Sequence, residues 1–168
     1  MKRTIQIILV MCLCFSMATK AQITKIDTYS NKIKDLSKAD REAIDNLFFG
    51  PISRIQLNES RDPSVLWEEE GTVKGVELNS NLISQLKNIS HSKPFATAQV
   101  LAIKWEKGKD LNIGEDNLML FGKLKYILIK SYDPISIDEL KTLLKDLISS
   151  EKISNDIEIV YFQMELPS

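Results

Sequence analysis

The chain has 168 residues, of which 43% are hydrophobic and 27% are charged. This composition is ordinary for a globular protein and argues against a disordered chain. Lys and Arg number 22, against 23 Asp and Glu, so the charge balance gives no electrostatic basis for binding nucleic acid or an anionic membrane surface. Length, composition and charge therefore indicate a folded chain without indicating its function.

Residues 1–21 have the parts of a secretory signal peptide. Lys2 and Arg3 form a positive end, an apolar run of about 13 residues follows, and small residues precede Gln22. A membrane-spanning helix needs about 20 apolar residues, so we expect cleavage between Ala21 and Gln22 rather than a retained anchor. Three basic residues leave with the signal, and the remaining 19 basic and 23 acidic residues give a balance of −4.

Both cysteines, Cys12 and Cys14, lie inside the apolar run. Neither follows the small residue that bacterial lipoprotein processing requires, so we expect the mature chain to be exported without a lipid. The alternative is a chain anchored in the envelope through its N-terminus. The mature chain, residues 22–168, is expected to form a single globular domain without cysteine. It can hold no disulfide, thiol nucleophile or thiolate-bound metal. An exported domain without disulfides favours a bacterial protein of the periplasm or the extracellular space.

Helical periodicity predicts a first helix after a polar lead-in at the start of the mature chain. Ser37 suits the N-cap of this helix, and Gly50 followed by Pro51 suits its end. Two weaker strands and a shorter helix complete the first half of the chain. The predicted elements are a helix over Leu36–Phe49, strands over Ser53–Leu57 and Thr72–Leu78, and a helix over Asn81–Ile89.

Alternation of apolar side chains predicts most of the strands in the second half. The turn at Lys107–Lys109 and the glycine at Gly122 suggest that the first three strands form a meander. Ser136 and Glu139 have the spacing of a capping box before an apolar helix. The predicted strands are Thr97–Glu106, Leu118–Phe121, Lys123–Ser131 and Ile157–Leu166, and the predicted helix is Ile137–Ser149.

The order of these elements predicts an α+β fold. We expect an antiparallel-dominated sheet of about five or six strands, with about three helices packed on one face. One exception is expected near the end of the chain. There the strand over Lys123–Ser131, the next helix and the last strand could form a right-handed crossover between parallel strands.

No motif for catalysis, a cofactor or a metal is evident in the sequence. His91 is the single histidine, which excludes a multi-histidine zinc site, and its polar surroundings indicate a solvated helix cap. Asp110–Asp116 has alternating oxygen-bearing side chains but lacks the glycine and the final glutamate of a calcium loop. The sequence also lacks a P-loop and a Gly-x-Ser-x-Gly elbow. We therefore predict no catalytic residue, cofactor site or metal site.

A cluster of one tryptophan and three acids is the candidate contact for a partner: Trp67, Glu68, Glu69 and Glu70. Exposed aromatic side chains are common anchors at interfaces. The alternatives are a buried tryptophan and a solvated acidic loop, because consecutive carboxylates on an extended chain point to opposite sides.

These features predict an exported, non-catalytic module that binds an unknown protein or small ligand in the cell envelope. One form of it is a periplasmic inhibitor or immunity-type protein that blocks a toxin or hydrolase by acidic complementarity. The alternatives are a small hydrolase that uses two carboxylates, and an envelope component that assembles through an open strand edge. An enzyme should show a concave site with convergent acids.

Overall fold

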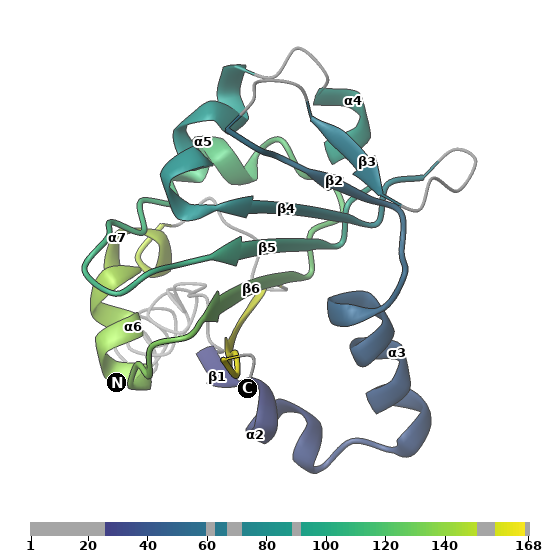
Figure 1. The fold of residues 1–168 in the computed structure, drawn as a ribbon, viewed down its shortest axis with the longest axis vertical. Coiled ribbons are helices and arrows are strands. Elements are labelled where there is room, and N and C mark those ends of the chain that lie inside the picture. Colours follow the sequence, from purple (N-terminus) through teal and green to yellow (C-terminus); the bar gives the residue numbers. More distant parts are fainter. Residues whose placement is uncertain (1–25, 60–62, 67–71, 89–91, 151–156, 167–168) are drawn as a thin grey trace, which may run out of the picture.

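The computed structural model describes residues 26–59, 63–66, 72–88, 92–150 and 157–166. These residues form a seven-stranded sheet in the order β1-β7-β6-β5-β4-β2-β3 (Figure 1). The strands are β1 (Ile26–Thr28), β2 (Arg54–Gln56), β3 (Ser64–Leu66), β4 (Gly75–Asn79), β5 (Val100–Lys104), β6 (Tyr126–Ser131) and β7 (Glu158–Gln163).

Neighbouring strands of the sheet run parallel, and only β2 and β3 pair in the antiparallel sense. The predicted antiparallel-dominated α+β sheet is therefore wrong, and the fold is α/β. The expected parallel crossover from β6 to β7 is correct. The central strands are apolar on both faces, as parallel strands covered by helices on both sides must be.

The predicted meander does not form, and the reason is the connection between β5 and β6. A turn does form after β5, with Gly108 at φ 84°, but the chain then continues through a helix, α5, before it enters β6. The predicted strand Leu118–Phe121 is in fact the end of α5 and the turn after it. A Cβ on Gly122 would lie 3.1 Å from the carbonyl oxygen of Ala96. This glycine thus permits a close approach of two backbones and does not make a hairpin.

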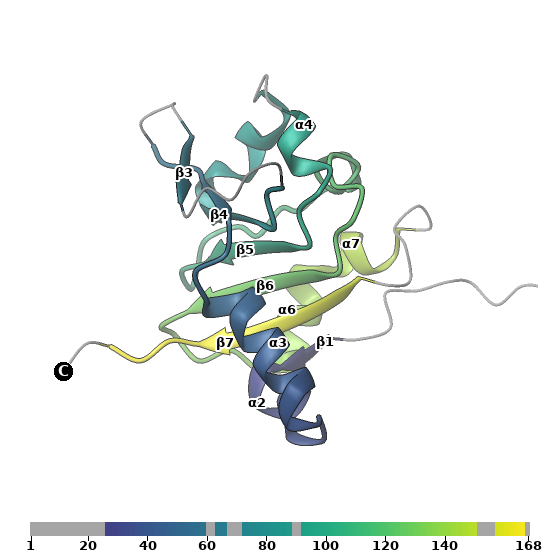
Figure 2. The ribbon, with the colours of Figure 1, turned by 90° about the vertical axis from the view of Figure 1, so that its right-hand side faces the viewer.

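Helices cover both faces of the sheet, contrary to the prediction of about three helices on one face (Figures 1 and 2). Each step from β4 through β7 moves one strand across in the same direction, so right-handed crossovers place these connections on one face. The helices are α2 (Tyr29–Lys34), α3 (Lys38–Phe49), the 3-10 helix η1 (Ser80–Asn88), α4 (Ser92–Phe95), α5 (Glu115–Leu118), α6 (Ile137–Leu143) and α7 (Lys145–Ile148).

The larger core lies between the sheet and the helices η1, α5, α6 and α7. Leu86, Leu140 and Leu147 from these helices pack with strand residues such as Leu101 and Ile127, all of them buried. Trp105, which directly follows β5, also has its side chain buried in this cluster. We call this side of the sheet the first face.

The second face is covered by α3, with α2 beside it. The chain must pass from β1 at one edge of the sheet to β2 near the opposite edge, and α2 and α3 make this connection. In Figure 2, α3 crosses in front of β6 and β7. Ile44 and Phe48 of α3 pack against Val100, Leu128 and Val160. The Tyr29 hydroxyl donates a hydrogen bond to the Asp45 carboxylate and so joins α2 to α3.

Several local predictions are correct. Ser37 and Ser136 are N-caps whose hydroxyl oxygens accept hydrogen bonds from the backbone NH groups of Asp40 and Glu139, each at 3.2 Å. Gly50 follows the last residue of α3, as expected. The helix predicted over Ile137–Ser149 divides at Leu144 into α6 and α7. By contrast, β1 and α2 form partly in a segment that was predicted to be a loose lead-in.

Candidate functional site

A groove of about 660 Å³ opens on the first face, between η1 and the pair α6 and α7. Its lining includes residues directly after β4 and a segment that follows β5, at the end of the sheet toward which the arrows of Figure 1 point. The apolar part of the lining is Ile83, Leu111, Ile113, Leu143, Leu144 and Leu147. The polar part is Ser80, Asn81, Ser84, Lys87, Lys109, Asp110, Asn112, Gly114, Asn117 and Asp146.

The fold explains why the groove forms at this place. In open parallel sheets, the loops that leave the carboxyl ends of the strands build the ligand sites. Here η1 leaves β4 directly, whereas residues 105–114 separate β5 from α5. This longer segment lies between the helices and supplies the lining residues from Lys109 to Gly114.

Hydrogen bonds fix the lining segment to the rest of the molecule. The Trp105 indole NH donates to the carbonyl oxygen of Lys109 at 2.8 Å. Asn117 is buried, and its carboxamide oxygen accepts from the Gly114 backbone NH at 3.0 Å. The amide NH₂ of Asn117 donates to the carbonyl oxygen of Ile83 at 3.2 Å. Asn117 therefore joins the segment to η1, and the groove is formed before any ligand arrives.

The groove offers an apolar floor and polar side chains of both charges. Leu111, Ile113 and Leu147 are buried, whereas Ser84 and Asn112 are exposed and free to present a hydroxyl and a carboxamide. Lys87 forms an exposed ion pair with Asp116 at 2.8 Å, an interaction that contributes little to stability. The volume of the groove is within the range of small-molecule sites, roughly 300 to 1,000 Å³. This chemistry suits a small polar molecule with an apolar part.

The carboxylates of the lining, Asp110 and Asp146, are both exposed. Both acids can therefore accept hydrogen bonds from a polar molecule in the groove. The described residues hold no group of three or more His, Cys, Asp and Glu side chains arranged to bind a metal ion.

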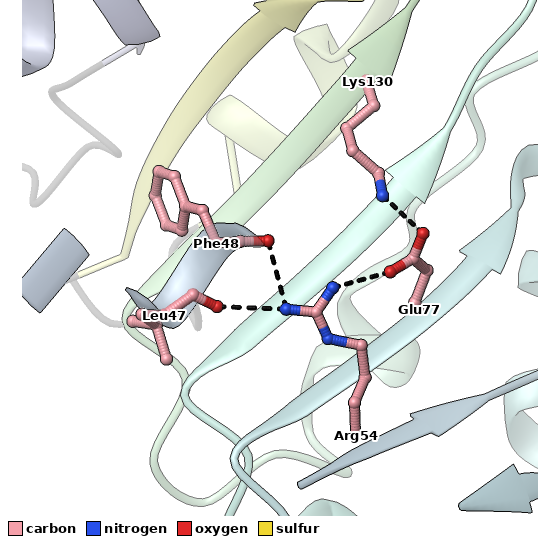
Figure 3. Close-up of polar contacts among 5 residues, drawn as sticks. All are labelled: Leu47, Phe48, Arg54, Glu77 and Lys130. Atoms are coloured by element: carbon pink, nitrogen blue, oxygen red, sulfur yellow. Dashed lines mark hydrogen bonds and ion pairs between the residues drawn. The ribbon is translucent and has the colours of Figure 1, made fainter. Parts of the chain in front are cut away.

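A network of charged side chains also lies on the second face (Figure 3). Glu77 of β4 accepts a hydrogen bond from Arg54 of β2 at 2.7 Å and a second bond from Lys130 of β6. Arg54 also donates to the carbonyl oxygens of Leu47 and Phe48, at 3.2 and 3.1 Å. Its guanidinium thus caps the end of α3 and holds this helix against the sheet.

The network keeps Glu77 ionised. Burial by itself raises the pKa of Glu77, but the hydrogen bond and charge of Lys130, and then those of Arg54, outweigh burial and hold the pKa below its ordinary value. Both carboxylate oxygens are already used by these two cations. Glu77 therefore acts as a structural acceptor and is not available as a general acid at neutral pH.

The residues singled out from the sequence lie elsewhere. Trp67, Glu68, Glu69 and Glu70, the predicted partner contact, are outside the described residues, as are Ala21 and Gln22 of the predicted cleavage site. The same holds for His91, Cys12 and Cys14.

The groove itself was missed from the sequence. Asn81 was predicted only as the start of a helix, and Asp110–Asp116 was noted only for its incomplete likeness to a calcium loop. No local motif marks these residues, because the groove depends on parallel pairing that brings together segments more than 60 residues apart. Only the correct topology would have indicated the carboxyl ends of β4 and β5 as a place for a site.

Comparison with known proteins gives no relative: no family model, curated protein or solved structure matches the chain. None of the helices in the described ranges is long and apolar enough to cross a membrane. The fold and groove define the chain as an α/β protein with a parallel sheet, and a fold alone does not determine function. Function must therefore be argued from the groove.

Proposed function

We propose that this chain is an exported, non-catalytic binding module that holds a small ligand in the groove between η1 and α6–α7. The observation that carries the proposal is the groove itself, a preformed concavity of about 660 Å³ with an apolar floor and polar walls. The N-terminal signal pattern supports export to the periplasm or the extracellular space, and the mild acidity of the chain argues against nucleic acid as a partner.

Native mass spectrometry tests the binding part of the proposal. The protein is incubated with the small-molecule fraction extracted from the envelope of its own cells and then measured. Ser84 lines the groove with an exposed side chain, so Ser84→Trp should fill the space with an indole. Lys38→Trp adds the same ring to α3 on the opposite face, where the Lys38 side chain is 91% exposed.

We expect a stoichiometric added mass on the wild type and on Lys38→Trp, and its loss from Ser84→Trp. An added mass that survives in Ser84→Trp, or no added mass on any of the three proteins, would contradict binding in the groove. Release of a cleaved product by the wild type would instead favour the alternative of a carboxylate-dependent hydrolase. Asp110→Asn and Asp146→Asn would then identify the acids.

The export part has its own test. The mass of the protein recovered from outside the cytoplasm should equal that of residues 22–168, because cleavage is expected between Ala21 and Gln22. A mass that retains residues 1–21 would contradict cleavage. A lipid on Cys12 would show instead that the chain is anchored in the envelope through its N-terminus.

A further inference from the structure

Another pocket lies between α3 and the amino ends of β4, β5 and β6, where the arrows of these strands begin in Figure 1. Its volume is about 270 Å³, and we call it the α3 pocket. The apolar part of its lining is Ala43, Ile44, Leu47 and Ile52. The polar part is Asn46, Lys74, Gln99, Lys125 and Tyr126.

Strand pairing brings three of the polar lining residues into a row. Lys74, Gln99 and Lys125 directly precede β4, β5 and β6, and the register of these strands places them side by side. The backbone NH of Gln99 donates to the carbonyl oxygen of Lys74 at 2.8 Å, and that of Lys125 donates to Gln99 at 2.9 Å. Neighbouring strands are about 4.8 Å apart, so about 10 Å separates the two lysine backbones. Their long, flexible side chains can therefore reach one anion above Gln99.

Positive charge dominates this part of the molecule. The lining of the α3 pocket, which belongs to the described part of the chain, has two lysines and no acid. Among the described residues, no carboxylate lies within ion-pair distance of Lys125. The network of Arg54, Glu77 and Lys130 holds two cations and one acid and so keeps one net positive charge. A concave site with charges of one sign attracts a ligand of the opposite sign.

Arg54 borders the α3 pocket and has an unused donor. Its guanidinium donates to the carbonyl oxygen of Leu47, one of the lining residues, at 3.2 Å (Figure 3). The Nε of Arg54 is buried and has no hydrogen-bond partner in the part of the chain that the structure describes. A Cβ on Gly75 would lie 3.3 Å from this Nε and 3.4 Å from Cδ1 of Ile52, another lining residue. Buried donors are nearly always satisfied in native proteins, so the unsatisfied Nε is a second indication that an acceptor belongs near this pocket.

We propose that the α3 pocket binds a small carboxylic acid with an apolar body, in its ionised form. The carboxylate would accept charge-assisted hydrogen bonds from Lys74 and Lys125, and the apolar body would lie against Ile44 and Leu47 of α3. The volume of about 270 Å³ is just below the roughly 300 Å³ at which small-molecule sites usually begin. The ligand is therefore a molecule with one ring or a short chain. An inorganic anion would leave the apolar side of the pocket in contact with water.

This proposal is independent of the proposed function. The α3 pocket is on the second face at the amino ends of the strands, whereas the groove is on the first face at their carboxyl ends. A ligand in one site would not occupy the other. Failure of either proposal therefore leaves the other unaffected.

Titration of the whole protein with benzoate, followed through the amide signals of its NMR spectrum, tests the proposal. Benzoate should shift the amides of residues 43–47, 74, 99 and 125–126, which line the α3 pocket. Benzamide has the same shape without the charge and should bind about tenfold more weakly. Binding of benzamide or inorganic phosphate as tight as that of benzoate would overturn the proposal, as would the absence of these shifts with benzoate.

A pair of lysine variants tests the charge. Lys125→Gln removes one lining cation and should weaken benzoate binding about fivefold. Lys123→Gln is the matched control, because Lys123 is exposed in the same segment but does not line the α3 pocket, and it should bind benzoate as the wild type does. Both side chains are exposed, so neither change disturbs the core. Equal losses of affinity in the two variants would overturn the proposal.

A pair of alanine variants tests the place. Ala43→Phe should fill the α3 pocket with a ring and abolish benzoate binding. Ala39→Phe adds the same ring one turn earlier in α3, where Ala39 is exposed and outside the lining, and should leave binding unchanged. Equal thermal midpoints of the two variants show that the fold is intact. Benzoate binding by Ala43→Phe as tight as that of the wild type would overturn the proposal.

Discussion

Glu77 joins three elements through one carboxylate, because its two cations come from the neighbouring strand β2 and from β6, two strands away. Lys130 must reach over β5 to make this contact, and the β5 residue beside Glu77 is Ala102, which is fully buried. A larger side chain at this position would lie in the path of Lys130. The side chains of Arg54 and Lys130 are only 7% and 14% exposed, so neither cation has much access to water if Glu77 is lost.

Replacing Glu77 by glutamine should lower the free energy of unfolding by about 2 kcal/mol, since two poorly hydrated cations lose their counter-ion. Urea unfolding at neutral pH measures the change. Glu42→Gln is the matched control, because Glu42 forms only an exposed ion pair with Lys38, and its loss should cost less than about 0.5 kcal/mol. Equal losses in the two variants would show that the network does not stabilise the fold.

Glu77 should also make the free energy of unfolding depend on pH. The pKa of Glu77 is lower in the folded protein than its ordinary value of 4.5, so the unfolded chain binds more protons between the two values. The stability that Glu77 contributes is complete well above pH 4.5 and is lost as the pH falls through the lower folded value. As the pH falls, the free energy of unfolding should therefore decrease less steeply for Glu77→Gln than for the wild type. Equal slopes in the two proteins would contradict this.

At the scale of elements, the caps and ends of the helices follow local rules and were correctly predicted from the sequence. Ser37, Gly50 and Ser136 occupy the predicted places because capping needs only a side chain and a backbone group within a few residues. Short elements were not predicted in this way. Helix α5 has four residues and β1 has three, which is too few for periodicity to appear.

The N-cap of α6 gives a direct test of one such rule. Ser136→Ala removes the acceptor of the Glu139 NH and should cost about 1 kcal/mol of unfolding free energy. Ser149→Ala is the control, since Ser149 is exposed and its hydroxyl only donates to the carbonyl oxygen of Asp146. A loss at Ser149 as large as that at Ser136 would argue against capping as the cause.

The end of α3 gives a second test. A Cβ on Gly50 would lie 2.6 Å from the carbonyl oxygen of Asn46, a backbone atom that cannot easily move. Gly50→Ala should therefore destabilise the protein by about 2 kcal/mol in urea unfolding. Gly114→Ala is the comparison, because its Cβ would meet only the Asn117 carboxamide oxygen at 3.4 Å, an ordinary contact. A smaller loss at Gly50 than at Gly114 would contradict this explanation of why α3 ends there.

At the scale of the whole molecule, the direction of the strands was not available from local patterns. The apolar residues on both sides of β5 and β6 suit a buried strand of either direction. What decides the direction is the path of residues 105–125, which cross the first face instead of turning back. The pairing of β1 with β7 places Ile26 beside Ile159. These residues are far apart in the sequence, and no local pattern indicates that they pair. The groove was missed for the same reason.

The most direct measurement of the central claim is amide hydrogen exchange on the whole protein, with and without the small-molecule fraction of its own cell envelope. Binding in the groove should slow exchange at the amides of residues 80–87, 109–117 and 143–147, which come from the segments that line it. Amides of α3 on the opposite face should be unchanged. Slowed exchange confined to other segments, or no change at any amide, would contradict the groove as the binding site.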